Sequence, residues 1–253
     1  MGKNKLAKFA DMAEWPHVFQ YPFDRLQEEG FANKGKWREE VFHNAAPLVL
    51  ELGCGKGEYT LGLATQSPDK DFIGIDIKGA RIWSGAKESF EEGMKNVAFL
   101  RTHIELLDAF FAPGEVDGIW LTFPDPQMKK PNKRLTSTRF MALYRELLSP
   151  GGLVHLKTDS LFLYTYTLEM LKANGLKPLF HTADLYAPEE TACPMEEGLR
   201  SIRTYYERQW LERGIPIKYL CFSCRKEGEF VEPEVEIEYD DYRSFNRRQR
   251  TTH

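Results

Sequence analysis

ELGCGKG, residues 51–57, is the most informative segment of this 253-residue chain. It follows a short apolar run, 48–52, which ends at a glycine and therefore predicts a buried strand. A helix is expected next, over about 57–66. Glycines between a strand and a helix permit a tight turn and let a ligand approach the backbone closely. The segment thus predicts a ligand-binding turn.

The spacing of these glycines narrows the kind of ligand. A nicotinamide-binding fingerprint, G-x-G-x-x-G, would need its third glycine at position 58, which is Glu58. The phosphate-binding pattern G-x-x-x-x-G-K-[ST] is absent as well. Glu51 precedes the turn, and Asp76 ends the next predicted strand, where a carboxylate commonly holds the ribose hydroxyls. Acids on both sides suit a cationic nucleoside, with Glu51 facing either its charged end or a structural amide.

The rest of the chain repeats this strand–helix alternation. Seven strands are predicted, at 48–52, 72–76, 97–101, 116–122, 153–157, 176–181 and 217–222. Intervening helices every 20–30 residues predict βαβ units and an α/β fold, with a mostly parallel seven-stranded sheet covered on both faces. We expect an N-terminal arm at 1–44, one domain at 45–226 and a C-terminal extension at 227–253.

Composition limits the class of protein. No apolar run reaches the roughly 18 residues of a membrane span, and no secretion signal is recognised at the start. Four cysteines are too few for a disulfide scaffold, which favours the reducing cytoplasm. The six histidines and the single CxxC show no metal-ligand spacing, so no metal is expected.

Charge is distributed unevenly along the chain. The net charge is −4, but residues 227–241 hold eight acids and no base. Without them, 34 bases face 30 acids. A basic tail with four arginines follows at 243–250. Because nucleic-acid binding depends on local patches, the acidic total does not exclude it.

A proline-rich loop follows the predicted strand at 116–122. In an open parallel sheet, ligands bind beyond the carboxyl ends of the strands, where Asp125 stands between two prolines that stiffen the backbone. A rigid carboxylate there suits a site better than packing. The loop then carries four bases, which suit a phosphate backbone: Lys129, Lys130, Lys133 and Arg134.

Further polar residues are expected at the same edge. Asp159 follows the strand at 153–157, and Thr204 and Glu207 precede the last strand. Asp159 and Glu207 are candidates to hold a base or a cationic side chain of the loop. A helix-capping role is an equal alternative for each.

Taken in order, ELGCGKG, FIGID, the FPDP loop with its bases, RLTSTRF, SPGGLVHLKTD and TYYE resemble one family. The chain resembles the tRNA (guanine-N7)-methyltransferases of the bacterial single-subunit type over roughly 45–222. The resemblance implies a class I methyltransferase fold, S-adenosylmethionine as cofactor and tRNA as partner. It also implies methylation of the guanine at position 46 of the RNA, in the variable loop.

The resemblance also implies roles for individual residues. Cofactor binding falls to Glu51, Gly53, Gly55, Asp76, His103 and Asp125, with Asp125 also catalytic. Substrate binding falls to Lys129, Asp159, Thr204 and Glu207, and residues 131–136 would lie along the RNA. Two positions depart from the family pattern: His103 stands where an Asp is usual, and Gln127 replaces a Trp.

The chemistry explains why such a site needs a carboxylate. Guanine N7 carries an in-plane lone pair and no proton, so methyl transfer to it needs no obligatory general base. Positioning and stabilisation of the cationic product ring suffice. We therefore expect Asp125 to orient the guanine and balance charge.

Three other functions stay open from the sequence. One is a class I methyltransferase acting on another substrate, against which the basic loop argues. Another is a non-catalytic RNA-binding partner, against which the intact Asp125 and glycine turn argue. A nicotinamide oxidoreductase is disfavoured by Glu58. Both a monomer and a homodimer are compatible with the sequence.

Overall fold

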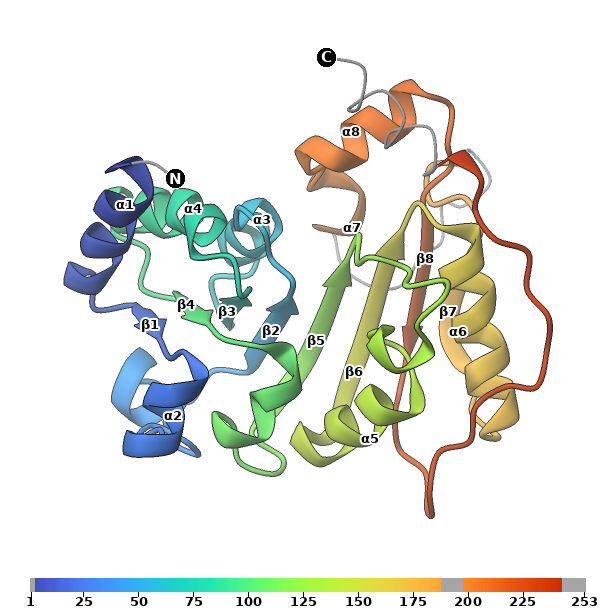
Figure 1. Ribbon diagram of the computed structural model, residues 1–253, viewed down its shortest axis with the longest axis horizontal. Coiled ribbons are helices and arrows are strands. Elements are labelled where there is room, and N and C mark those ends of the chain that lie inside the picture. The colour runs from blue at the N-terminus through green and yellow to red at the C-terminus, as the bar shows by residue number, and fades with distance from the viewer. Residues whose placement is uncertain (1–2, 188–197, 243–253) are drawn as a thin grey trace.

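The computed structural model describes residues 3–187 and 198–242, which form a sheet with helices on both faces (Figure 1). The arginine-rich tail predicted at 243–250 lies outside the described residues. The strands are β1 (Val18–Gln20), β2 (Leu48–Leu52), β3 (Asp71–Ile75), β4 (Val97–Arg101), β5 (Val116–Thr122), β6 (Leu148–Thr158), β7 (Pro178–Thr182) and β8 (Lys218–Phe222).

The strand order within the described residues is β1-β4-β3-β2-β5-β6-β8-β7. All neighbours from β1 to β6 are parallel, and β8 runs antiparallel to β6 and β7. The mostly parallel α/β sheet is confirmed, but it has eight strands where seven were predicted. The additional strand is β1, which pairs with β4 through Val18 and Phe99.

Helices follow the strands as the alternation predicts. They are α1 (Lys3–Glu14), α2 (Phe23–Glu29), α3 (Glu58–Gln66), α4 (Gly79–Glu91), α5 (Thr138–Leu147), α6 (Leu161–Ala173), α7 (Gly198–Ser201) and α8 (Tyr205–Glu212). Short helical turns are η1 (Trp37–Phe42), η2 (Ile104–Ala109) and η3 (Pro131–Lys133). Among the described residues, none of these helices has the length and apolar character that a membrane span requires.

Alternation along β2 shows how both faces are filled. Leu48 and Leu50 belong to the apolar cluster under η1, α5 and α6, whereas Val49 belongs to the cluster under α1, α3 and α4. Successive side chains of a strand point to opposite faces, so a run that is apolar throughout must be covered twice. Glu51 therefore points toward α3, on the Val49 side.

The chain after β8 forms an extended segment that we call the C-terminal strap, residues 223–242. It passes along α6 and returns toward the edge where β5 and β6 end (Figure 1). Glu232 accepts hydrogen bonds from Thr138 of α5 and Tyr166 of α6, and Asn174 exchanges two hydrogen bonds with the backbone of Val231. These contacts attach the strap to the helical layer over much of its length.

Candidate functional site

The predicted glycine turn lies directly beyond the carboxyl end of β2. Gly53, Gly55 and Gly57 have φ angles of 81°, 58° and 80°, in the left-handed region that favours glycine. The Gly53 amide donates to the carbonyl of Ile75 at 2.7 Å, which ties the turn to β3. A Cβ atom at Gly53 would meet no atom within 4 Å, so the backbone there borders open space. The turn thus has the free approach that a ligand needs.

Asp76 braces the turn from β3. One carboxylate oxygen accepts the Gly55 amide at 3.1 Å, and the other accepts the Lys78 amide at 2.8 Å. A carboxylate has about four acceptor sites, so these two hydrogen bonds leave acceptor capacity. Asp76 is therefore placed to fix the turn and to accept further donors such as ribose hydroxyls.

Glu51 lies beneath the turn and is almost completely buried. Its carboxylate accepts hydrogen bonds from the hydroxyl groups of Thr60 and Thr122. The structural partners of Glu51 are therefore hydroxyl groups and not the backbone or side-chain amide considered from the sequence. Burial raises the pKa of Glu51 to about 7, although the two hydroxyl hydrogen bonds lower it. Because this pKa lies near neutral pH, a cationic group that binds beside Glu51 can shift its carboxyl group to the ionised form.

Two cavities meet above the turn. A cavity of about 170 Å³ is lined by Glu51, the glycine turn and residues of α8, including Tyr205. A second cavity of about 490 Å³ contains Asp125, Asp159 and Trp210. Both are lined by Gly53, Arg81, Phe123 and Tyr206. The glycine turn and Asp125 are thereby brought to one continuous site.

Asp125 is exposed in the larger cavity. Its carboxylate accepts the amide of Gln127 at 3.0 Å. Phe123 and Gln127, on either side, have φ angles of 50° and 48°, which non-glycine residues rarely adopt. Such backbone conformations cost on the order of 1–3 kcal/mol each and occur preferentially at functional sites. The rigidity predicted from the prolines thus coincides with two unusual backbone angles.

Asp159 and Glu207 reach the same region from the sheet and from α8, but both are fully buried. Asp159 accepts the hydroxyl of Tyr242 at 2.8 Å. Glu207 pairs with Lys157 at 2.8 Å and accepts the Tyr186 hydroxyl at 2.6 Å. Burial lowers the pKa of Lys157 to about 8, although Glu207 raises it. Glu207 therefore lies inside the wall of the site rather than on its surface.

Thr204 caps α8, a role that was considered from the sequence for Asp159 and Glu207 and not for Thr204. Its hydroxyl oxygen accepts the backbone amide of Glu207 at the start of α8. Thr204 stands between α7, which ends at Ser201, and α8, which begins at Tyr205. The cap sets where α8 begins and so places Tyr206 and Trp210 at the cavity.

The basic loop divides into exposed and buried residues. Lys129, Lys130 and Lys133 are exposed, and Lys133 lies 3.3 Å from Glu105. Arg134 is only 7% exposed and donates to the carbonyls of Gln127 and Met128. Its guanidinium also lies over the rings of Phe162 and Tyr166. The lysines face solvent, whereas the arginine holds the loop from within.

His103 is exposed just beyond β4 and precedes η2. Phe123 and Trp210 were not predicted as site residues, and Tyr206 was predicted only as part of the Thr204–Glu207 stretch, yet all three supply aromatic walls to the cavities. The sequence features that could have identified them are their positions: Phe123 directly follows β5, and Tyr206 and Trp210 lie on α8, which begins next to Thr204. Within the described part of the chain, no cluster of His, Cys, Asp or Glu side chains is placed to hold a metal ion.

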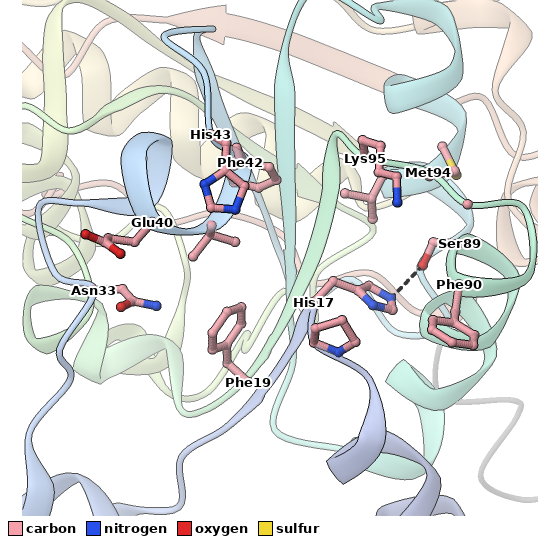
Figure 2. A pocket seen from close by; sticks show the side chains of 14 residues that line it. His17, Phe19, Asn33, Glu40, Phe42, His43, Ser89, Phe90, Met94 and Lys95 are labelled. Carbon is pink, nitrogen blue, oxygen red and sulfur yellow. Dashed lines mark hydrogen bonds between the residues drawn. The ribbon is translucent and has the colours of Figure 1, made fainter.

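Another cavity, of about 460 Å³, lies at the amino end of β4 (Figure 2). His17 lines it and is hydrogen-bonded to Ser89 at 3.0 Å, and Phe90 and Phe42 are further lining residues. Burial lowers the pKa of His17. None of the predicted site residues is among its lining; the glycine turn and Asp125 lie at the opposite edge of the sheet.

Comparison with known proteins gives consistent results. The model of a family described as "Putative methyltransferase" matches residues 45–220. A tRNA (guanine-N(7)-)-methyltransferase of Bacteroides fragilis is 58% identical over 251 residues, covering 99% of this chain and 98% of the relative. The protein of that name from Porphyromonas gingivalis is 60% identical over 243 residues, covering 95% and 98%.

Solved structures share the fold at low sequence identity. An antibiotic-related methyltransferase is 16% identical with a TM-score of 0.53, covering 83% of this chain and 96% of its own. The 16S rRNA methyltransferase KamB is 14% identical with a TM-score of 0.53, covering 77% and 92%. At these identities the similarity establishes the class I methyltransferase fold alone.

Proposed function

The chain belongs to the tRNA (guanine-N(7)-)-methyltransferase family, and we propose that it transfers a methyl group from S-adenosylmethionine to N7 of a guanine in tRNA. The observation that carries the proposal is the exposed Asp125 in a cavity that shares Gly53 and Phe123 with the glycine-turn cavity. The guanine at position 46 of the variable loop is the proposed target. Since the substrate is tRNA, we place the activity in the cytoplasm.

The residues around the turn fit S-adenosylmethionine. The open space above Gly53 admits a ligand, and Glu51 offers a carboxylate to a cationic end. Asp76 has acceptor capacity for ribose hydroxyls, and Gly55 keeps the turn close to it. His103, at the end of β4, would lie toward the base of the nucleoside. When bound, the cofactor supplies an electrophilic methyl group on a sulfonium centre.

Asp125 is proposed as the catalytic residue. It accepts one backbone amide and is otherwise exposed in the cavity, so it can accept N–H donors of a guanine. A fixed carboxylate also stabilises the positive charge that develops on the ring. Because N7 carries no proton, Asp125 positions the base and does not need to abstract a proton.

The remaining predicted substrate residues are assigned by their place relative to the cavity that contains Asp125, since Asp159 and Glu207 are equally buried and only Asp159 is among its lining residues. Asp159 lines the cavity and is the candidate for a second contact with the base. Glu207 and Thr204 are assigned to hold α8, through the Lys157 ion pair and the helix cap. Tyr206 and Trp210 on α8 then give flat apolar surfaces against which a base can stack.

The exposed lysines are proposed to contact the RNA backbone. Lys129, Lys130 and Lys133 follow the catalytic loop, where a phosphate backbone would pass beside the bound base. Arg134 supports them indirectly, because it anchors the carbonyls of Gln127 and Met128. A base that enters the cavity beside Asp125 has to leave its stack, which is typical of enzymes that modify nucleic-acid bases.

The test is a labelling experiment with purified protein, unmodified tRNA and methyl-labelled S-adenosylmethionine. After nuclease digestion, the labelled nucleoside should be N7-methylguanosine. Asp125→Ala should abolish labelling and should lower cofactor affinity far less than it lowers turnover. A different labelled product would assign another substrate. Binding of cofactor and tRNA by the wild-type protein without transfer would favour a non-catalytic RNA-binding partner.

A further inference from the structure

The C-terminal strap ends at the proposed substrate side of the cavity. Tyr242, its last residue, donates its phenolic hydrogen to an oxygen of Asp159 at 2.8 Å. Its ring also meets Trp210 edge to face, with centroids 5.4 Å apart and planes at 76°. Asp159 and Trp210 both line the cavity that contains Asp125. One residue from beyond the last strand therefore contacts two walls of the site.

The end of the strap is attached to the start of α6 by hydrogen bonds and ring packing. Asp240 is 8% exposed, accepts the hydroxyl of Ser160, and accepts the amide of Phe162 at 3.0 Å. These groups form the first turn of α6, directly after Asp159. The Tyr239 ring packs against Phe162 with centroids 5.4 Å apart. Asp240 thus caps α6 and holds Tyr242 two residues farther on, beside Asp159.

We propose that Tyr242 is a positioning residue for the substrate guanine, acting through Asp159 and Trp210. The inference rests on the proposed function of the site. Tyr242 is not among the residues that line the cavity, so its influence on a bound base passes through these two neighbours. The strap then completes the substrate site of the preceding domain.

The chemistry of guanine explains why the carboxylate needs this support. Guanine presents N1–H and its exocyclic amino group side by side, and one carboxylate accepts both only when it lies near the plane of the base. Asp159 is fully buried, so protein donors, not bulk water, set its orientation. The phenol of Tyr242 is such a donor, and a hydrogen bond to a charged acceptor is among the stronger kinds. The Trp210 contact fixes the adjoining wall in the same way.

The experiment compares Tyr242→Phe with a matched control, Tyr239→Phe, on the same strap. Steady-state kinetics with unmodified tRNA should show kcat/KM about tenfold lower for Tyr242→Phe, as expected for loss of a hydrogen bond to a charged group. S-adenosylmethionine affinity and the melting temperature should stay at wild-type values. Tyr239→Phe should remain within about twofold of wild type, because the Tyr239 ring packs on Phe162, and neither residue is among those that line the cavity of Asp125.

A second arm tests whether Tyr242 acts through Asp159. In an Asp159→Ala background, adding Tyr242→Phe should cause little further loss, since residues that act as a unit are not additive. An undiminished further loss would overturn the proposal. So would wild-type kinetics in Tyr242→Phe, or an increase in kcat/KM, which would mean that the phenol competes with the base.

Affinity for tRNA separates this inference from the proposed function. If the wild-type protein binds tRNA but transfers no methyl group, the proposed function fails. Tyr242 is then judged on the dissociation constant of unmodified tRNA, which should rise severalfold in Tyr242→Phe and not in Tyr239→Phe. An unchanged constant would contradict the positioning role, and a wild-type protein that does not bind tRNA would overturn both.

Discussion

The ammonium nitrogen of Lys157 lies 2.8 Å from the carboxylate of Glu207, and neither side chain is exposed to solvent. Lys157 also donates to the carbonyls of Leu199 and Ile202, beside α7. The pair therefore links β6 to α7 and α8 across the interior. Buried ion pairs contribute little net stability, but removal of one partner leaves an uncompensated charge.

Glu207→Ala should consequently be strongly destabilising. We expect the free energy of unfolding to fall by about 3–5 kcal/mol, because Lys157 stays buried without its counterion. Urea unfolding monitored by circular dichroism measures this. The double variant Lys157→Met/Glu207→Leu, which removes both charges, should recover part of the loss. A Glu207→Ala protein as stable as wild type would show that the pair is not buried as described.

Glu51 should make cofactor binding depend on pH. Its pKa is about 7 in the protein without cofactor, so it is mainly protonated at pH 6 and mainly ionised at pH 8. A cationic ligand favours the ionised form, so affinity should rise with pH by up to about tenfold over this range. Calorimetric titration at several pH values checks this, with Glu51→Gln as control. Titration of the ligand itself is common to both proteins, so a Glu51→Gln curve as steep as wild type would exclude Glu51 as the cause.

His155 should make the fold sensitive to acid. Its ring stacks on Trp120 with centroids 4.3 Å apart, and burial lowers its pKa to about 3. Between pH 6.5 and 3 the unfolded chain binds a proton at this residue that the folded protein does not bind, so stability falls as pH falls through this window. From pH 7.5 to 5 the expected loss is about 2 kcal/mol.

Comparison with His155→Asn isolates this contribution. The variant is less stable at neutral pH because the stacking is lost, but its stability should decline less between pH 7.5 and 5. Glu51 contributes with the opposite sign, since its raised pKa favours the folded state at lower pH, and it is present in both proteins. Parallel urea titrations at the two pH values suffice. Equal declines in both proteins would contradict the assignment.

Lys130 and Arg134 should have distinguishable effects on tRNA binding. Lys130 is exposed, so Lys130→Ala should reduce the slope of log affinity against log salt by about 1. Arg134 is buried, so Arg134→Met should leave the slope unchanged and lower the free energy of unfolding by about 1–3 kcal/mol. Filter binding at several salt concentrations and urea unfolding provide the two readouts. A reduced slope in Arg134→Met would place this residue on the RNA.

The positions of Glu51, Asp76 and Asp125 at one edge of the sheet follow from the sequence. Each acid stands at the end of, or just beyond, a short apolar run that predicts a strand. Because parallel strands end at the same edge of the sheet, predicting the strands was enough to predict that the three acids lie along that edge. The helices between the strands were predicted for the same reason. Periodicity carries this information locally, without knowledge of tertiary contacts.

Other features depend on contacts that no local pattern encodes. Charge alone does not distinguish Lys130, which is exposed, from Arg134, whose guanidinium lies over the rings of Phe162 and Tyr166. Glu207 resembles an exposed helical acid until Lys157, 50 residues earlier in the chain, is found beside it. Residues 234–239 of the strap alternate acidic and apolar side chains as a strand would, yet they form no strand. The return of the strap to Asp159 becomes visible only through Asp240 and Tyr242.

The three-residue strand β1 has a consequence for handling the protein. It covers the outer side of β4, whose residues Val97–Leu100 are buried and apolar. A fragment limited to residues 45–220, the extent of the family match, would lack β1 and leave β4 as a bare sheet edge. Unprotected apolar edges recruit strands from other molecules. The isolated central region, produced recombinantly, should therefore aggregate. In the full chain the first 44 residues prevent this, because they supply the strand that covers the edge of β4.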